Sequence, residues 1–193
     1  MRPFFVAPTN SLKPLPIMKI RFHSCALLVA TAAFALAGAH AAPPKTPDQK
    51  FAQKAAVGGM FEVMLGGVAE KNAESADVKK FGAMMVTDHG KAGEELTAIA
   101  GKEGLKLPTK LPAKLQTKVD KISGLTGKAF DAAYVSEMVA DHEKDLAAFK
   151  AASTSLSDPA LKEFAKKTSA VVEKHLSTIK KIQAKMNAKV LPH

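Results

Sequence analysis

Three histidines and one glutamate are the side chains of this sequence that are best suited to chemistry. His89, His142 and His175 each fall in the apolar stripe of a different predicted long helix, and Glu62 falls nearer the edge of the stripe of another. Imidazole and carboxylate groups suit Zn, Cu, Fe or Mn, and helical bundles build metal sites from such inward-facing side chains. The pattern therefore predicts a divalent transition-metal site with Asp88, at the margin of its stripe, as a fifth candidate ligand.

A structural interpretation of the same residues stays open. Buried polar side chains have to be hydrogen-bonded, so the histidines can equally be core residues paired with Glu62, Asp88 or Asp145. The two interpretations differ in one respect only, which is whether a metal ion occupies the layer.

The depth of each residue in the bundle bears on this choice. Counting about 1.5 Å per helical residue from the inter-helix turns, we expect Glu62, His89 and His142 in one layer, about 18 to 22 Å below the top of the bundle. The same count places His175 nearer to about 12 Å, roughly two turns higher. This expected offset argues against one site with four ligands.

A di-iron carboxylate centre is not expected. Such centres need a Glu-x-x-His motif on each of two helices and two further glutamates. The residues three positions before the histidines are Val86, Val139 and Val172.

Six methionines at helical spacing are typical of core packing rather than of copper handling: Met60, Met64, Met84, Met85, Met138 and Met186. Since no complete catalytic constellation is present, the sequence favours a protein that is not an enzyme.

Four long helices and one short helix must position these side chains. Gly104 ends the second helix and Ser157-Asp158-Pro159 opens the last one, whereas Asp48 is the expected cap of the first. No strand-like alternation occurs. The expected ranges are 48–72, 75–102, 114–122 for the short helix, 128–152 and 159–189. Two antiparallel pairs joined by a long crossover that contains the short helix predict an all-α, ferritin-like four-helix bundle, with an up-down-up-down bundle as the alternative.

The N-terminal segment has the pattern of a secretory signal peptide. Lys19 and Arg21 form a positive region, residues 25–38 are apolar, and Ala39-His40-Ala41 is a cleavage motif. We therefore expect residues 1–41 to be removed on export to the periplasm, with Met18 as the true start. Residues 42–47 form a linker and residues 48–190 the bundle domain, which carries no transmembrane anchor.

Removal of the leader also changes the charge argument. The whole chain has 28 basic and 18 acidic residues, a net charge of +10. Both arginines lie in the leader, so the mature cations are all lysines, and aromatic residues are only 6% of the chain. Because nucleic-acid recognition favours arginine and aromatic platforms, a nucleic-acid partner is not expected.

Several short motifs together resemble a known family. They are Ala55-Ala56-x-Gly58-Gly59-x-Phe61-Glu62-Val63, Met85-Val86-x-Asp88-His89, Ser123-Gly124, Phe130-Asp131-x-x-Tyr134, Met138-Val139-x-x-His142 and His175-Leu176. In this combination the chain resembles the exported bacterial ferritin-like domains of unknown function of family 4142. The resemblance implies a periplasmic or outer-membrane-associated helical bundle, and it singles out the same candidate residues: Glu62, Asp88, His89, His142 and His175.

Two functions follow from these observations. One is a non-catalytic, exported bundle with a binding or envelope-stress role, whose polar layer is structural or binds metal without turnover. The other is a metal-storage protein or metalloenzyme in which Glu62, His89 and His142 are ligands and His175 or water completes the shell. The oligomeric state and the physiological partner are left open by the sequence.

Overall fold

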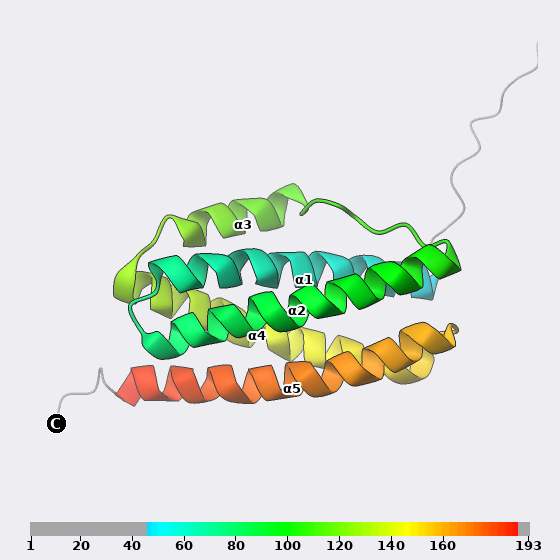
Figure 1. The fold of residues 1–193 in the computed structure, drawn as a ribbon. Helices are drawn as coiled ribbons and strands as arrows, with labels where there is room; N and C mark the ends of the chain where they lie inside the picture. Colours follow the sequence, from blue (N-terminus) through cyan, green and yellow to red (C-terminus); the bar gives the residue numbers. More distant parts are fainter. Residues whose placement is uncertain (1–45, 189–193) are drawn as a thin grey trace, which may run out of the picture. The chain divides into compact units, whose positions relative to one another are not determined.

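The computed structural model describes residues 46–188, and Figure 1 shows the arrangement of its five helices. Within this range the chain forms α-helices and connecting segments, with no β-strand. The helices are α1 (Pro47–Asn72), α2 (Ala76–Glu103), α3 (Ala113–Ser123), α4 (Gly127–Ser155) and α5 (Pro159–Ala188). The predicted leader, its cleavage site and most of the linker lie outside the described residues, as do residues 189 and 190 at the end of the predicted domain.

The order of the helices confirms the ferritin-like bundle. Helix α1 packs along α2, and α4 packs along α5, as two antiparallel pairs. The crossover, residues 104–126 including α3, then returns the chain to the end of the bundle where α1 stopped (Figure 1). A parallel bridge between Ala73 and Gly127 places the start of α4 beside the turn between α1 and α2. Helices α2 and α4 therefore run in the same direction, which excludes the up-down-up-down alternative.

Most helix ends follow the expected local chemistry. Gly104 ends α2 in the left-handed conformation with φ +64°, which glycine adopts at no steric cost. Asp158 caps α5, since its Oδ1 accepts a hydrogen bond from the Leu161 amide at 2.7 Å. The prediction that Asp48 caps the first helix was wrong. Thr46 accepts from the Gln49 amide instead, at 3.1 Å, because Pro47 starts the helix one residue earlier.

The Asp48 carboxylate contacts the turn before α5 instead of capping α1. It accepts hydrogen bonds from the Ser157 and Asp158 amides at 2.9 and 3.0 Å. These amides belong to the turn between α4 and α5, so Asp48 ties the start of α1 to the far pair of helices.

The crossover is held against α1 at both of its ends. Near its start, the side-chain amides of Gln49 and Gln53 donate to the Lys106 carbonyl oxygen at 2.8 and 2.9 Å. Near its end, the Asn72 side chain donates to the Ser123 and Leu125 carbonyl oxygens, both at 2.9 Å. The segment between these anchors therefore passes over the outer face of α1.

Two apolar clusters fill the bundle, one on each side of a polar layer. The first contains Phe61, Phe81, Tyr134 and Ile179, and the second contains Leu96, Phe149 and Phe164 among others. The buried polar residues of the described chain are Glu62, His89, Asp131, His142, Thr168 and His175. None of the described helices is long and apolar enough to cross a membrane.

Candidate metal centre

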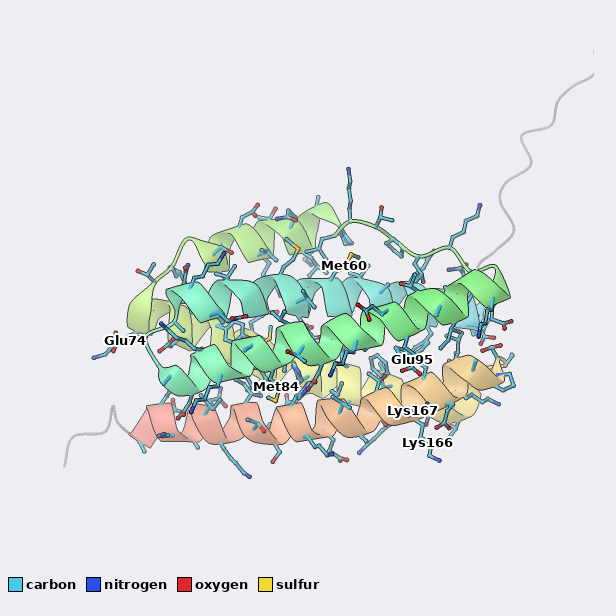
Figure 2. All side chains as sticks on the ribbon, in the orientation of Figure 1. Met60, Glu74, Met84, Glu95, Lys166 and Lys167 are labelled. Carbon is cyan, nitrogen blue, oxygen red and sulfur yellow. The ribbon has the colours of Figure 1, made fainter. Side chains whose placement is uncertain are left out.

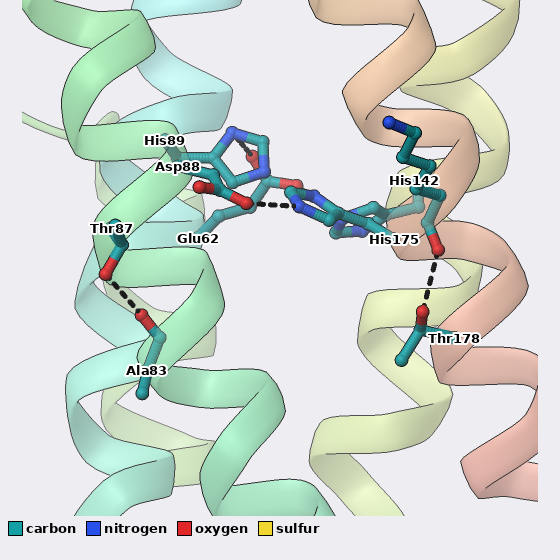
Figure 3. Close-up of polar contacts among 9 residues, drawn as sticks. Glu62, Ala83, Thr87, Asp88, His89, His142, His175 and Thr178 are labelled. Carbon is teal, nitrogen blue, oxygen red and sulfur yellow. Dashed lines mark hydrogen bonds and ion pairs between the residues drawn. The ribbon is translucent and has the colours of Figure 1, made fainter.

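Three imidazole rings converge inside the bundle, each from a different helix. His89 comes from α2, His142 from α4 and His175 from α5, and their exposed fractions are 7, 0 and 2% (Figure 3). Their ring centroids are 5.3 to 5.8 Å apart. One ring nitrogen of each histidine lies within 4.8 Å of one nitrogen of each of the others. The three rings therefore surround a common point in the core.

Each ring is oriented by a contact at one of its nitrogens. The Nδ1 atom of His89 lies 2.9 Å from Glu62 Oε2, and Nε2 of His175 lies 3.0 Å from Asp88 Oδ2 (Figure 3). The Nδ1 atom of His142 lies 2.9 Å from the Met138 carbonyl oxygen. A proton on each of these three nitrogens satisfies all three acceptors. Outer partners of this kind, carboxylates and a carbonyl, are what hold metal-binding histidines in place.

The second nitrogen of each ring is buried and has no hydrogen-bond partner within residues 46–188. These atoms are His89 Nε2, His142 Nε2 and His175 Nδ1. Leaving a buried polar atom unpaired costs about 1–3 kcal/mol, so three such atoms at one place need an explanation. When each ring is neutral and its other nitrogen is protonated, these three nitrogens carry lone pairs that are able to bind a metal ion.

Glu62 and the three histidines differ in charge. Glu62 and His89 form a charged pair, whereas the rings of His142 and His175 are neutral. Burial opposes ionisation of both Glu62 and His89, but the attraction and hydrogen bond between them outweigh it. The pKa of Glu62 is therefore lowered and the pKa of His89 is raised. Burial lowers the pKa of His142 to about 4 and also lowers that of His175. At neutral pH the rings of His142 and His175 are uncharged, as ligation requires, whereas His89 has to release its second ring proton when a metal binds.

A second cluster of acidic groups adjoins the histidines through Glu62. One carboxylate oxygen each of Glu62, Asp141 and Asp145 lies within 4.8 Å of those of the other two. Burial, and then the charge of Glu62, raises the pKa of Asp141 to about 6 and that of Asp145 to about 7. Asp145 was predicted from the sequence as a pairing partner of the histidines, whereas Asp141 was not predicted. The spacing of four residues between the two aspartates, one helical turn, is the signal that was available.

The structure brings all five predicted residues together. Glu62, His89 and His142 share a layer as expected, and Asp88 lies behind His175 rather than among the rings. Glu62 is 1% exposed, so it lies deeper than its position near the stripe edge indicated.

The expected two-turn offset of His175 was wrong. Helix α4 continues to Ser155, three residues beyond the expected end at Ala152. Counted from the turn between α4 and α5, His142 is 13 residues before Ser155 and His175 is 16 residues after Pro159. The difference of three residues is less than one helical turn, so the two rings meet.

A family model described as a domain of unknown function, DUF4142, matches residues 33–182. The chain belongs to this family. The match contains all five predicted site residues, and it confirms the resemblance drawn from the short motifs. No curated protein sequence matches the DUF4142 chain.

Two solved structures share its fold. One is a DUF305 protein from Streptomyces coelicolor described as secreted, with 15% identity and a TM-score of 0.63 over 76% of this chain and 97% of that one. The other is a DUF305 fragment from Deinococcus radiodurans, with 14% identity and a TM-score of 0.62 over 74% of this chain and 99% of that one. At this identity the likeness establishes the helical fold alone.

Proposed function

We propose that this DUF4142 protein binds one divalent transition-metal ion through His89, His142 and His175. The observation that carries the proposal is the set of three buried, unpartnered ring nitrogens, one on each histidine. A tetrahedral Zn²⁺ site has Zn–N bonds of about 2.0–2.1 Å, so its ligand nitrogens lie roughly 3.4 Å apart. One ring nitrogen of each histidine already lies within 4.8 Å of one nitrogen of each of the others, and small side-chain rotations bring ligand nitrogens to that spacing.

The charge around the rings supports the same conclusion. The carboxylates of Glu62 and Asp88 accept from His89 and His175, which makes these imidazoles better electron donors and offsets the charge of a cation. Imidazole-only sites suit Zn, Cu, Fe and Ni, and three protein ligands leave a fourth position for water or another molecule.

The proposed role is metal binding outside the cytoplasm, without turnover. Supporting observations are the signal-peptide pattern of residues 18–41 and the description of the Streptomyces coelicolor relative as secreted. The missing Glu-x-x-His motifs argue against oxygen chemistry at a di-iron centre. A binding or stress-protective role in the cell envelope fits these features better than catalysis does.

Elemental mass spectrometry tests the proposal. Protein is purified without chelator or affinity-tag histidines from cells that express the full chain, and is compared with the His89→Ala/His142→Ala double variant. The parent is expected to hold close to one Zn or Cu per chain, directly or after incubation with the metal, and the double variant none. The intact mass of the same preparation tests export, since a first residue near Ala42 is expected.

Two further variants separate metal loss from misfolding. Asp88→Asn keeps the size of the side chain and removes the carboxylate behind His175, so metal affinity should fall by about 10–100-fold. Glu163→Gln removes an exposed carboxylate of α5 and should leave the affinity unchanged. A parent that takes up neither Zn nor Cu contradicts the proposal, and the histidines are then a structural layer. Retention of the residues before Ala42 contradicts export.

A further inference from the structure

A wide apolar groove approaches the polar layer from the side of the crossover. Its volume is about 1390 Å³, and its walls come chiefly from α1, α2 and the crossover segment before α3. Met60, one of its lining residues, is labelled in Figure 2 between α1 and the crossover. The buried Glu62 and His89 and the half-buried Asp145 are among its lining residues. The hydrogen bonds of Gln49 and Gln53 to Lys106 hold the crossover in place beside it.

The glycines that line this groove are not required by helix packing. A Cβ atom added at Gly90, Gly93 or Gly101 would meet nothing within 4 Å, and at Gly59 the nearest atom would be 3.9 Å away. Glycine inside a helix costs about 0.5–1 kcal/mol relative to alanine. Because no neighbouring atom forbids a side chain at these positions, the glycines keep space open in the groove.

Two other glycines provide the contrast. A Cβ atom at Gly66 would lie 2.6 Å from the Gly82 carbonyl oxygen, and one at Gly82 would lie 2.7 Å from the Gly66 carbonyl oxygen. Both are needed for the close approach of α1 and α2, and neither lines the groove. Gly66 and Gly82 thus allow contact between helices, whereas Gly90, Gly93 and Gly101 leave the groove wide.

One residue that lines the groove, Glu62, carries a buried hydrogen-bond acceptor without a partner. Glu62 is 1% exposed, and its Oε1 atom has no hydrogen-bond partner in the described chain. The nearest candidate donor, His142 Nδ1, lies 3.4 Å away and is used by the Met138 carbonyl oxygen. The Asp145 carboxyl group lines the groove nearby. Two carboxyl groups favour a ligand that donates a hydrogen bond and disfavour one with a negative charge.

We propose that this groove binds an apolar alkyl or aromatic small molecule with a neutral hydrogen-bond-donating head group, such as an alcohol, phenol or aromatic amine. The apolar body lies against the glycine-lined wall, and the head group donates to Glu62 Oε1 after a side-chain shift that uncovers this buried atom. The volume is sufficient, since small-molecule pockets are typically about 300–1,000 Å³. This binding uses none of the three unpartnered histidine nitrogens, so it goes beyond the proposed metal site and does not depend on it.

A fluorescent probe and a pair of matched glycine variants test the proposal. 1-Aminoanthracene, an apolar aromatic amine, is titrated into chelator-treated protein, and decanol and decanoate are compared as competitors. Gly93→Leu fills the groove, and Gly67→Leu places the same side chain in equally open space outside it. Both substitutions remove a helical glycine, so both variants are expected to fold, as circular dichroism will show.

The expected result has three parts. The probe binds the parent and Gly67→Leu with equal affinity, binds Gly93→Leu at least about tenfold more weakly, and is displaced by decanol but not by decanoate. Absence of probe binding to the parent, or equal affinity of the two leucine variants, overturns the proposal that the groove binds an apolar ligand. If decanoate displaces the probe as effectively as decanol does, the preference for a neutral, hydrogen-bond-donating head group is wrong. Metal content is measured on the same samples, so failure of the metal site is distinguished from failure of the groove.

Discussion

At the scale of single residues, the two nitrogens of each imidazole ring have different surroundings. One nitrogen of each ring contacts a carboxylate or a carbonyl of the protein, and the other is buried without a hydrogen-bond partner in the described chain. A purely structural layer would pair both nitrogens, because unpaired buried atoms are costly. The unpaired nitrogens therefore support the proposed metal site over a layer that only holds the helices together.

Asp145 provides a pH-dependent prediction at this scale. Its pKa is raised to about 7 by burial and by the charges of Glu62 and Asp141. Between pH 4 and pH 7 the folded chain binds more protons at this group than the unfolded chain does, so this group makes stability fall as pH rises through that window. Asp145→Asn removes the effect, so the melting temperature of the variant should exceed that of the parent by a growing margin, about 2–5 °C at pH 8.

Thermal melts of metal-free protein from pH 4 to pH 8 check this prediction. Glu163→Gln, an exposed change on α5, serves as the control and should show no such trend. A difference between Asp145→Asn and the parent that is constant over the whole pH range would contradict the raised pKa of Asp145.

Individual ligand candidates were predictable because periodicity reports which face of a helix a residue occupies. Their relative depth in the bundle was less predictable. The expected end of α4 was three residues too early, which displaced His175 by most of a helical turn. The Met138 carbonyl and the pairing of Asp141 with Asp145 depend on contacts between and along helices that residue type alone does not reveal.

At the scale of elements, the buried Asp131 connects two helices that are distant in the sequence. Its carboxylate accepts hydrogen bonds from the Glu74 and Ser75 amides at 3.1 and 2.9 Å, and its exposed fraction is 4%. Ser75 precedes α2 and makes no side-chain cap of its own. Asp131 of α4 therefore supplies from another helix the acceptors that the start of α2 needs.

Loss of this carboxylate should destabilise the bundle. Asp131→Ala leaves the two amides without their acceptor, and hydrogen bonds to charged groups contribute about 1.5–3 kcal/mol. We expect the free energy of unfolding to fall by about 2–3 kcal/mol in urea titrations followed by circular dichroism. Asp120→Ala, an exposed change on α3, should shift it by less than about 0.5 kcal/mol. Equal stability of Asp131→Ala and the parent would exclude this role for Asp131.

Helix boundaries were predictable where a special backbone conformation or a cap marks them. Gly104 and Asp158 are examples, since a left-handed glycine and a capping aspartate act within a few residues of the chain. Asp48 was misassigned because its partners lie more than 100 residues away, and Asp131 was overlooked as a cap for the same reason.

At the scale of the whole bundle, the two antiparallel pairs meet at the polar layer. His89 belongs to the first pair, whereas His142 and His175 belong to the second. An ion held by all three would link the pairs, much as the exposed Glu95–Lys167 ion pair does on the surface, where its atoms are 3.7 Å apart (Figure 2). The all-α topology was predictable from the number of helices and the long crossover. The groove was not, because it depends on where the crossover passes.

Anomalous X-ray diffraction from crystals soaked in Zn²⁺ shows whether an ion binds among the three histidine rings. We predict one peak at the zinc absorption edge, about 2.0–2.1 Å from one ring nitrogen of each of His89, His142 and His175. The peak should be absent from crystals of the His89→Ala/His142→Ala variant. A map with no peak among the three rings, or with its peak only between Asp141 and Asp145, would contradict the account.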